Sequence, residues 1–262
     1  MNLPFYVVKA FSNDPFQGNP AGIVLLDQLL KKSDMQSIAS INGFPETVFL
    51  YGQKSGSFYE IWWFTPSQEV YDAGHATLAA QFVLFEYIHT HDTFNTLTLN
   101  WDTGQRCVHR QTANTITYAN RSPMISLTSA PPIPAGIDAD FYTADDDLIL
   151  VLDNSEAVKH YQPNLEQLST LPYRGLAITS SDVQYDYCCR FFAPKYGVAE
   201  DYVTATAHKY LSHYWSTRKR LSAVTGVQYS RSPGVVRSQI ASHHVYLSGD
   251  CRIYSKGTLT LR

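Results

Sequence analysis

The chain has 262 residues, which corresponds to one large domain or two smaller ones at about 100 to 200 residues per domain. Hydrophobic residues make up 44% and charged residues 16%, so neither a disordered chain nor a charged coiled coil fits. The formal net charge of -3 provides no large positive field for a phosphate backbone. We expect a compact globular protein that does not bind nucleic acid.

The N-terminal ten residues lack a cationic stretch followed by an apolar one, so we expect no signal peptide. The longest nearly apolar run, residues 76–85, is far shorter than the roughly 20 residues of a membrane helix. The four cysteines lack the spacing of a tetrahedral metal site. We therefore predict a cytoplasmic protein with no membrane partner, no bound metal and cysteines that are small buried hydrophobes.

The first third of the chain predicts strands and one short helix. Residues 5–11 and 21–26 favour strands because they are rich in aromatic and β-branched side chains, and turn residues separate them. Ser33 opens a capping box for a short helix that we expect to end at Gly43. The strand predicted next, residues 46–51, places Glu46 at its start.

An aromatic strand is predicted at residues 58–64, and a strongly helical, almost wholly apolar segment follows at residues 75–85. We expect this helix to be buried. It starts at Ala73-Gly74-His75, where the first backbone N–H groups have no partner inside the helix and can face a ligand.

The segment 119–134 is rich in Ser and Pro and lies near the midpoint, so it predicts a connector. The expected halves are residues 1–118 and 119–262, with two placements open for the last strand, in the C-terminal half or back in the N-terminal half. Further strands are predicted at residues 148–152, 175–178 and 183–192.

An internal similarity links the two halves. Tyr59–Pro66 resembles Tyr187–Pro194 at an offset of 194 minus 66, or 128 residues. Each copy precedes a small-residue helix start, at Ala73–Thr77 and Val203–Ala207. The pattern indicates a duplication, although one short match in a chain rich in aromatics is also compatible with chance.

Two helix starts that face a common cleft would supply free N–H donors and two positive dipole ends, a setting that binds an anion such as a carboxylate. Charge stabilisation there would help a neighbouring carbon to lose a proton. The chemistry then needs a base. The candidates near these elements are Glu46, Asp72, His75 and Asp201, with Glu69 and Glu200 further out.

Each main candidate also has a structural interpretation. Glu46 fits a solvated carboxylate at a strand edge. His75 fits a helix cap or a core histidine, and Asp201 fits a plain N-cap for the helix predicted over residues 204–214.

Four motifs in order resemble the phenazine-biosynthesis PhzF-like family: Gly18-Asn19-Pro20-Ala21, Pro45–Phe49, Phe64-Thr65-Pro66 followed by Gly74–Ala79, and Arg190–Pro194 followed by Glu200-Asp201-x-x-Thr204. The resemblance implies the α+β fold of diaminopimelate epimerase. In that fold, two similar halves each wrap a curved, mostly antiparallel sheet around a central helix, and the active site lies in the cleft between them.

The resemblance also implies a cofactor-independent isomerase, often a homodimer in a biosynthetic process, that moves a proton between carbons of a small carboxylic acid. Glu46 takes the position of the general acid/base, and His75 and Asp201 assist it. Asn19 and Gly74 contribute to the site wall, and Thr206 stands where the family usually has Ser. The absence of a Gly-x-Gly-x-x-Gly stretch after a strand also argues against nicotinamide or flavin.

The chain departs from the family pattern at the second helix start, where Tyr202 and Ala205 replace Pro and Gly. Asp72 adds an acid beside the expected anion site. These changes put the family's best-known substrate, a dihydro-hydroxyanthranilate, in doubt. The alternative function is a non-catalytic metabolite-binding or protein-interaction module on the same scaffold. A two-thiol racemase is excluded because Ala73 stands at the first thiol position, and a serine hydrolase would need a Gly-x-Ser-x-Gly motif, which is absent.

Overall fold

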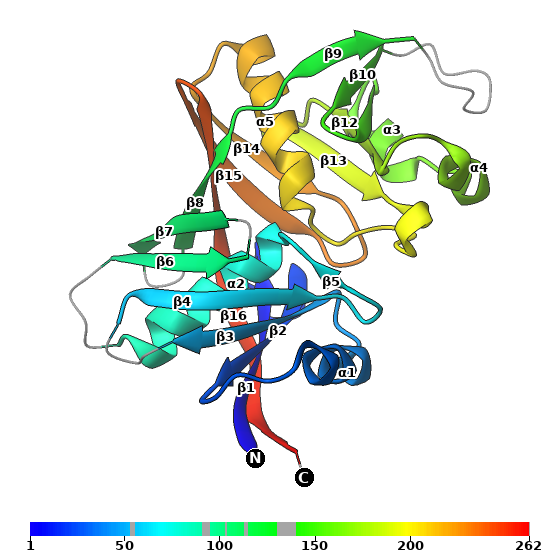
Figure 1. Cartoon of the computed structure of the whole chain (residues 1–262). Coiled ribbons are helices and arrows are strands. Elements are labelled where there is room, and N and C mark those ends of the chain that lie inside the picture. Colours follow the sequence, from blue (N-terminus) through cyan, green and yellow to red (C-terminus); the bar gives the residue numbers. More distant parts are fainter. Residues whose placement is uncertain (53–55, 91–94, 103, 113–114, 130–139, 262) are drawn as a thin grey trace. The chain divides into compact units, whose positions relative to one another are not determined.

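The computed structural model describes residues 1–52, 56–90, 95–102, 104–112, 115–129 and 140–261 (Figure 1). The Pro-rich part of the expected connector, residues 131–134, and the side chain of Cys107 lie outside this description. The chain divides into two compact units, each considered separately below. Unit 1 comprises Met1–Ala119 and Ser248–Arg262, and unit 2 comprises Asn120–Leu247.

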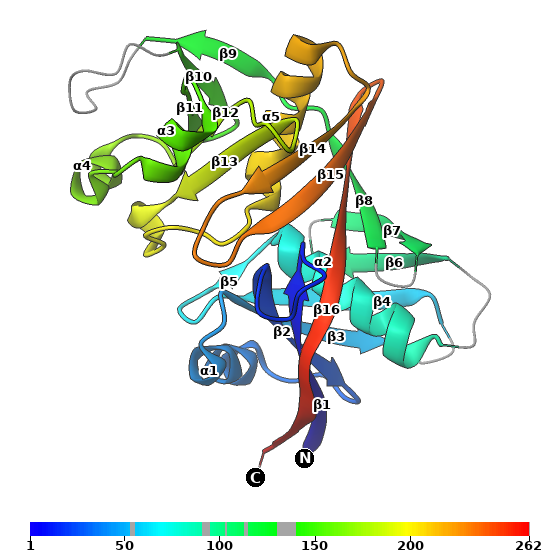
Figure 2. The ribbon, with the colours of Figure 1, turned by 180° about the vertical axis from the view of Figure 1, so that it is seen from behind.

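Unit 1 contains a mixed sheet in the order β1-β2-β3-β4-β6-β7-β8, in which β2–β3 and β4–β6 are parallel pairs. The long last strand, β16, pairs with β1, and the two chain ends lie side by side (Figures 1 and 2). The strands are β1 (Asn2–Ala10), β2 (Asn19–Leu26), β3 (Glu46–Gly52), β4 (Phe58–Phe64), β5 (Glu69–Val70), β6 (Thr96–Trp101), β7 (Gly104–Thr112), β8 (Thr115–Arg121) and β16 (His244–Thr260).

The central helix of unit 1 is α2 (Gly74–Val83), which continues into one π-helical turn, Leu84–Ile88. It packs against β1, β2 and β3, and every residue of α2 after Gly74 is buried. The almost wholly apolar sequence of this segment explains why the sheet curves around it (Figure 1).

The short helix α1 (Lys32–Asn42) ends as predicted, because Gly43 adopts a left-handed conformation with φ of 66°. Its predicted start is wrong. The N-cap is Lys31 and makes no side-chain cap bond, so Ser33 lies inside the helix. The carbonyl of Lys31 already accepts the N–H groups of Asp34 and Met35, and the backbone therefore starts the helix without the expected serine cap.

The strands of unit 2 follow the order β15-β14-β13-β12-β11-β10-β9, again with parallel and antiparallel pairs. Its longest helix, α5, packs against β14 and β15 (Figure 2). The elements are β9 (Ile125–Thr128), β10 (Asp140–Ala144), β11 (Asp147–Val151), α3 (Ser155–His160), α4 (Leu165–Thr170), β12 (Gly175–Ser180), β13 (Tyr187–Phe192), a 3-10 turn (Pro194–Tyr196), α5 (Ala205–Lys219), β14 (Ala223–Gln228) and β15 (Gly234–Ala241).

Two predicted boundaries in this part of the chain are wrong. The strand expected from residue 183 begins only at Tyr187, because Asp182 accepts the N–H groups of Gln184 and Tyr185 and forms a turn. The expected connector contains all of β9 and part of β8, so its Ser and Pro content marks strand ends as well as a linker.

The strands of the two units share one topology, which confirms the predicted α+β fold of two similar halves. Neighbouring strands in β1-β2-β3-β4-β6-β7 and in β10-β11-β12-β13-β14-β15 pair antiparallel, parallel, antiparallel, parallel and antiparallel in turn. The repeated tyrosines also correspond. Tyr59 Oη lies 2.8 Å from His89 Nε2, and Tyr187 Oη lies 2.7 Å from His208 Nδ1.

Candidate active site

A carboxylate and an imidazole meet at the start of α2. Glu46 is the first residue of β3, and its Oε2 atom lies 2.9 Å from Nε2 of His75, the second residue of α2. The side chains are 18% and 8% exposed, respectively. The pair is thus largely shielded from bulk water, and the two atoms in contact are themselves buried.

Hydrogen bonds hold the start of α2 in place. Trp63 Nε1 on β4 donates to Thr77 Oγ1 over 2.9 Å, and the same hydroxyl donates to the carbonyl of Ala73 over 2.9 Å. Ala73 is the N-cap and makes no side-chain cap bond. The position of His75 is therefore set by a buried contact between helix and sheet.

Asn19 lies near this pair in the sheet. It is the fully buried first residue of β2, and β2 runs parallel to β3 with Ala21 opposite Glu46, so both strands start at the same edge. Gly18 makes the entry to β2 possible. Its φ is +79°, and a Cβ there would lie 2.3 Å from the carbonyl oxygen of Ala10.

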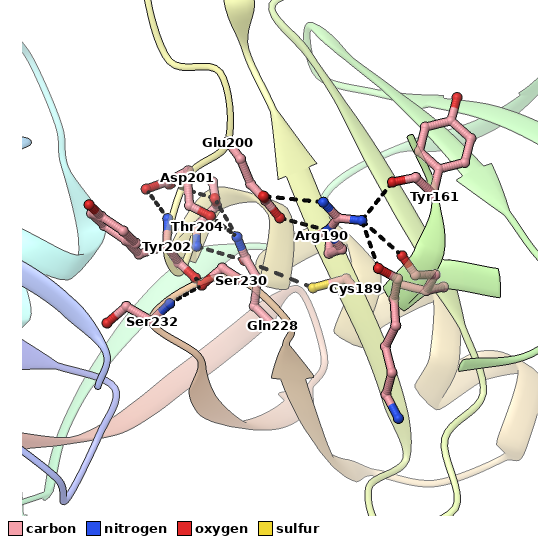
Figure 3. A network of polar contacts seen from close by, with 12 residues as sticks. Tyr161, Cys189, Arg190, Glu200, Asp201, Tyr202, Thr204, Gln228, Ser230 and Ser232 are labelled. Carbon is pink, nitrogen blue, oxygen red and sulfur yellow. Dashed lines mark hydrogen bonds and ion pairs between the residues drawn. The ribbon is translucent and has the colours of Figure 1, made fainter. Parts of the chain in front are cut away.

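In unit 2, Asp201 belongs to a hydrogen-bonded network just before α5 (Figure 3). Its Oδ2 accepts the Thr204 hydroxyl at 2.6 Å, and its Oδ1 accepts the N–H of Tyr202 at 2.8 Å. The N-cap of α5 is Thr204, so Asp201 is not the plain N-cap considered from sequence. The carboxylate is instead oriented by the loop that leads into the helix.

Gln228, fully buried at the end of β14, completes this network. Its Oε1 accepts the N–H of Thr204 at 2.8 Å, and its Nε2 donates to the Asp201 carbonyl at 2.9 Å and to Thr204 Oγ1 at 3.2 Å. Because Gln228 donates to the Thr204 hydroxyl, the hydroxyl proton is directed to the Asp201 carboxylate.

Arg190 ties the same loop to the end of α3 (Figure 3). Its guanidinium donates to both carboxylate oxygens of Glu200, at 2.6 and 3.2 Å. Its Nη1 donates to three carbonyls at the end of α3, those of Val158, Lys159 and Tyr161. This bidentate pair fixes the residue directly before Asp201.

A second charged cluster touches the first turn of α5. Arg174 donates from Nε and Nη2 to the two carboxylate oxygens of Asp147, which is only 1% exposed, and Nη2 also donates to Thr206 Oγ1 at 3.0 Å. Tyr210, one turn further along α5, donates to Asp147 at 3.0 Å. Burial raises the pKa of Asp147 above its ordinary value although Arg174 opposes that shift. Burial alone would lower the pKa of Arg174. The neighbouring Asp147 outweighs this effect, so the pKa of Arg174 lies above its ordinary value.

The buried thiols and imidazole of unit 2 are electrically neutral groups. Burial raises the pKa of Cys188 to about 11 and that of Cys189 well above its ordinary value, and it lowers the pKa of His208 to about 3. Cys188, Cys189 and Cys251 are buried free thiols, as expected from the sequence.

Within the described residues, no group of three or more His, Cys, Asp or Glu side chains is placed to hold a metal ion. The described helices also include none that is both long and apolar enough to cross a membrane.

Comparisons with known proteins agree with this picture. The sequence model of the phenazine biosynthesis-like protein family matches residues 8–257. The chain belongs to this family. An uncharacterized isomerase of Pseudomonas aeruginosa is 34% identical to it over 267 residues and is matched over the full length of both chains.

Solved structures extend the likeness. A PhzF-family phenazine biosynthesis protein of Enterococcus faecalis matches with a TM-score of 0.93 and 30% identity, over 100% of both chains. A hydroxyproline epimerase of Agrobacterium vitis matches with a TM-score of 0.61 and 9% identity, over 98% of this chain and 92% of its own. The second likeness concerns the fold alone.

In this PhzF-like chain, the site residues predicted from the sequence form two groups. Unit 1 carries Asn19, Glu46, Asp72, Gly74 and His75, of which Glu46 and His75 are in direct contact and Asp72 is an exposed residue just before α2. Unit 2 carries Asp201, Ala205 and Thr206 at the start of α5.

Sequence reasoning missed three residues whose side chains hold the unit 2 group in place, namely Asp147, Arg174 and Gln228. One signal could have found Arg174. Extending the 128-residue repeat backwards places Tyr173-Arg174 opposite Pro45-Glu46, so that Arg174 falls opposite Glu46.

Proposed function

We propose that the protein is a cofactor-independent isomerase that moves a proton between two carbons of a small carboxylic acid. Glu46 is the group that removes and returns the proton. The observation that carries this proposal is the 2.9 Å contact between Glu46 Oε2 and His75 Nε2 at the start of α2. Family membership and the isomerase name of its relatives also support it.

His75 has two roles in this mechanism. It orients the carboxylate of Glu46 toward the ligand, and it stabilises the charge that changes as Glu46 gains and loses a proton. Because His75 is the second residue of α2, its backbone also belongs to the first turn, whose N–H groups favour an anion.

Asp201 is the second acid of the proposed reaction. Its carboxylate is fixed by Tyr202 and Thr204 within hydrogen-bonding distance, so it can receive or supply a proton without a change of rotamer. Positioned groups of this kind contribute about 100-fold to 10,000-fold to a rate. Its neighbours in the first turn of α5, Ala205 and Thr206, are proposed to contact the ligand.

The free, buried cysteines support a reducing, cytoplasmic setting for this activity. The proposed ligand is a small carboxylate, and a proton-transfer reaction of this type needs no redox cofactor.

Proton exchange with solvent tests the function. The purified protein is incubated in deuterated water with a panel of small carboxylic acids that have acidic C–H bonds, and deuterium incorporation is followed by mass spectrometry. We expect incorporation into at least one acid, at a rate proportional to enzyme concentration. Measurable binding of an acid without exchange into any member of the panel would favour the non-catalytic module.

A further inference from the structure

The repeat assigns Arg174 a definite counterpart. In unit 1, Phe64 of the Phe-x-Pro motif pairs with Thr47, and Glu46 is the residue before Thr47. In unit 2, the equivalent Phe192 pairs with Leu176, and Gly175 and Arg174 come before it. Gly175 thus occupies the place of Glu46, and Arg174 precedes it at the start of the equivalent strand.

The helix partners correspond as well. His75 and Thr206 are each the second residue of the central helix of their unit. In unit 1 the strand start reaches the helix through Glu46 and His75, at 2.9 Å. In unit 2 it does so through Arg174 Nη2 and Thr206 Oγ1, at 3.0 Å. The same backbone frame therefore presents an acid with an imidazole in one unit and a guanidinium with a hydroxyl in the other.

Two of the three guanidinium nitrogens of Arg174 make hydrogen bonds to side chains of unit 2. Its Nε and Nη2 groups bind Asp147 and Thr206, whereas its Nη1 group makes no hydrogen bond to any residue in the described part of the chain. The side chain is 35% exposed, while Asp147 is 1% exposed. Asp201 adds to the effects that raise the pKa of Arg174, so the two groups are within electrostatic reach.

The Thr206 hydroxyl is also able to donate a hydrogen bond to a ligand. Its oxygen accepts the Arg174 N–H, which directs the hydroxyl proton away from Arg174 and leaves it able to donate. A guanidinium N–H pair and a hydroxyl donor side by side match the two oxygens of a carboxylate. The first turn of α5 adds a favourable dipole to the same place.

We propose that Arg174 and Thr206 together bind the carboxylate of the ligand and so select acids over their neutral analogues. This assignment rests on the proposed function only for the identity of the ligand as a small acid. Asp147 and Tyr210 act as positioning residues that hold the guanidinium in this orientation.

The test compares an acid with its neutral analogue, using benzoate and benzamide as probes in titrations followed by protein NMR. Arg174→Gln should weaken benzoate binding by at least about tenfold, corresponding to the loss of a charged contact, and leave benzamide binding unchanged. Arg174→Lys should give an intermediate loss, because it keeps the charge but not the planar fork. Thr206→Val should weaken benzoate binding, and Thr206→Ser should restore it.

Folding is controlled separately, since Arg174→Gln leaves the buried Asp147 carboxylate without its partner. The double variant Asp147→Asn/Arg174→Gln has no buried charge at this position and should show the same loss of benzoate selectivity. Arg218→Gln, an exposed arginine at the other end of α5, should bind both probes like the wild type.

Equal benzoate affinity in the wild type and the double variant would overturn the assignment. A parallel loss of benzamide binding, or no benzoate binding by the wild type, would also overturn it. The failure of the proposed function looks different: an inactive protein would show no deuterium exchange, yet benzoate binding would still depend on Arg174.

Discussion

Units 1 and 2 use one backbone arrangement for two kinds of chemistry. At the equivalent strand and helix starts, unit 1 brings together Glu46 and His75, whereas unit 2 brings together Arg174 and Thr206. A carboxylate and an imidazole exchange protons in the physiological pH range more readily than a guanidinium and a hydroxyl do. The comparison suggests that duplication supplied two similar frames, of which one is suited to proton transfer and the other to charge recognition.

The supporting residues differ for the same reason. In unit 2 the guanidinium needs a counter-charge, and Asp147 provides it from the first position of β11. The strand register places Ala21 at the corresponding position of β2, because Ala21 pairs with Glu46 as Asp147 pairs with Gly175. Unit 1 needs no such group, since Glu46 and His75 are partners of each other.

The largest expected effect is the loss of proton transfer when Glu46 of unit 1 is replaced. Glu46→Gln keeps the shape and a hydrogen-bonding end of the side chain but removes its basicity. Deuterium exchange into a bound acid should fall by about 100-fold to 10,000-fold, while the dissociation constant changes by less than about tenfold. Exchange is followed by mass spectrometry and binding by titration calorimetry.

Glu60→Gln provides the matched control for this substitution, because Glu60 is an exposed glutamate on the neighbouring strand β4. Its exchange rate should equal that of the wild type. Full exchange in Glu46→Gln would move the base to another acid such as Asp201, and an equal loss of binding would favour a role in holding the ligand.

The next effect concerns the buried ion pair of Arg174 and Asp147 in unit 2 and its contribution to stability. Asp147→Ala leaves the Arg174 guanidinium without its buried counter-charge and removes an acceptor from Tyr210. We expect a loss of about 3–5 kcal/mol in the free energy of unfolding, measured by urea denaturation. Asp145→Asn should cost at most about 1 kcal/mol, because Asp145 pairs with Lys209 at the surface with its side chain 51% exposed and asparagine tolerates its φ of 50°. Similar losses in both variants would contradict the expectation that the buried ion pair matters more for stability than the surface pair.

Local patterns in the sequence were sufficient for β1 to β4, for β11 to β13 and for the central helix of unit 1, but they predicted no residue ranges for β5 to β10 or for β14 to β16. Glu46 and His75 were candidates because they lie at a predicted strand start and a predicted helix start, and the resemblance to a known family gave them their expected roles. Asp147 and Arg174 could not be found from local patterns, because their contact depends on the parallel pairing of β11 with β12. The same holds for Gln228, which reaches Thr204 from a strand 24 residues further along the chain.

A smaller effect concerns the pH dependence of unfolding. His208 is buried against Tyr187 and Cys189, and its pKa of about 3 in the folded protein lies below the value of about 6.5 for an exposed histidine. The unfolded chain therefore binds a proton that the folded protein does not bind as the pH falls below about 6.5. Its contribution should lower the free energy of unfolding by up to about 1.4 kcal/mol per pH unit until about pH 3.

His208→Gln should remove this contribution, so urea denaturation between pH 6 and pH 4 should give a shallower dependence than for the wild type. Tyr187→Phe retains the buried imidazole and should keep the steeper dependence. Identical slopes for the wild type and His208→Gln would show that His208 does not remain neutral in the folded protein.

The smallest expected effects concern a buried hydrogen bond between tryptophan and threonine that occurs in both units. The tryptophan lies on a strand in unit 1 and on the helix in unit 2. In unit 1, Trp63 on a strand donates to Thr77 on the helix, whereas in unit 2, Trp215 on the helix donates to Thr179 on a strand, both over 2.9 Å. Thr77→Val and Thr179→Val each leave a buried indole N–H unpaired, so each should lower the free energy of unfolding by about 1–3 kcal/mol in urea denaturation. Thr217→Val, at an exposed position of α5, should stay within about 0.5 kcal/mol of the wild type. Equal losses in the two units would indicate that the contact stabilises both frames alike, and a loss in only one would show that the other unit repacks around its tryptophan.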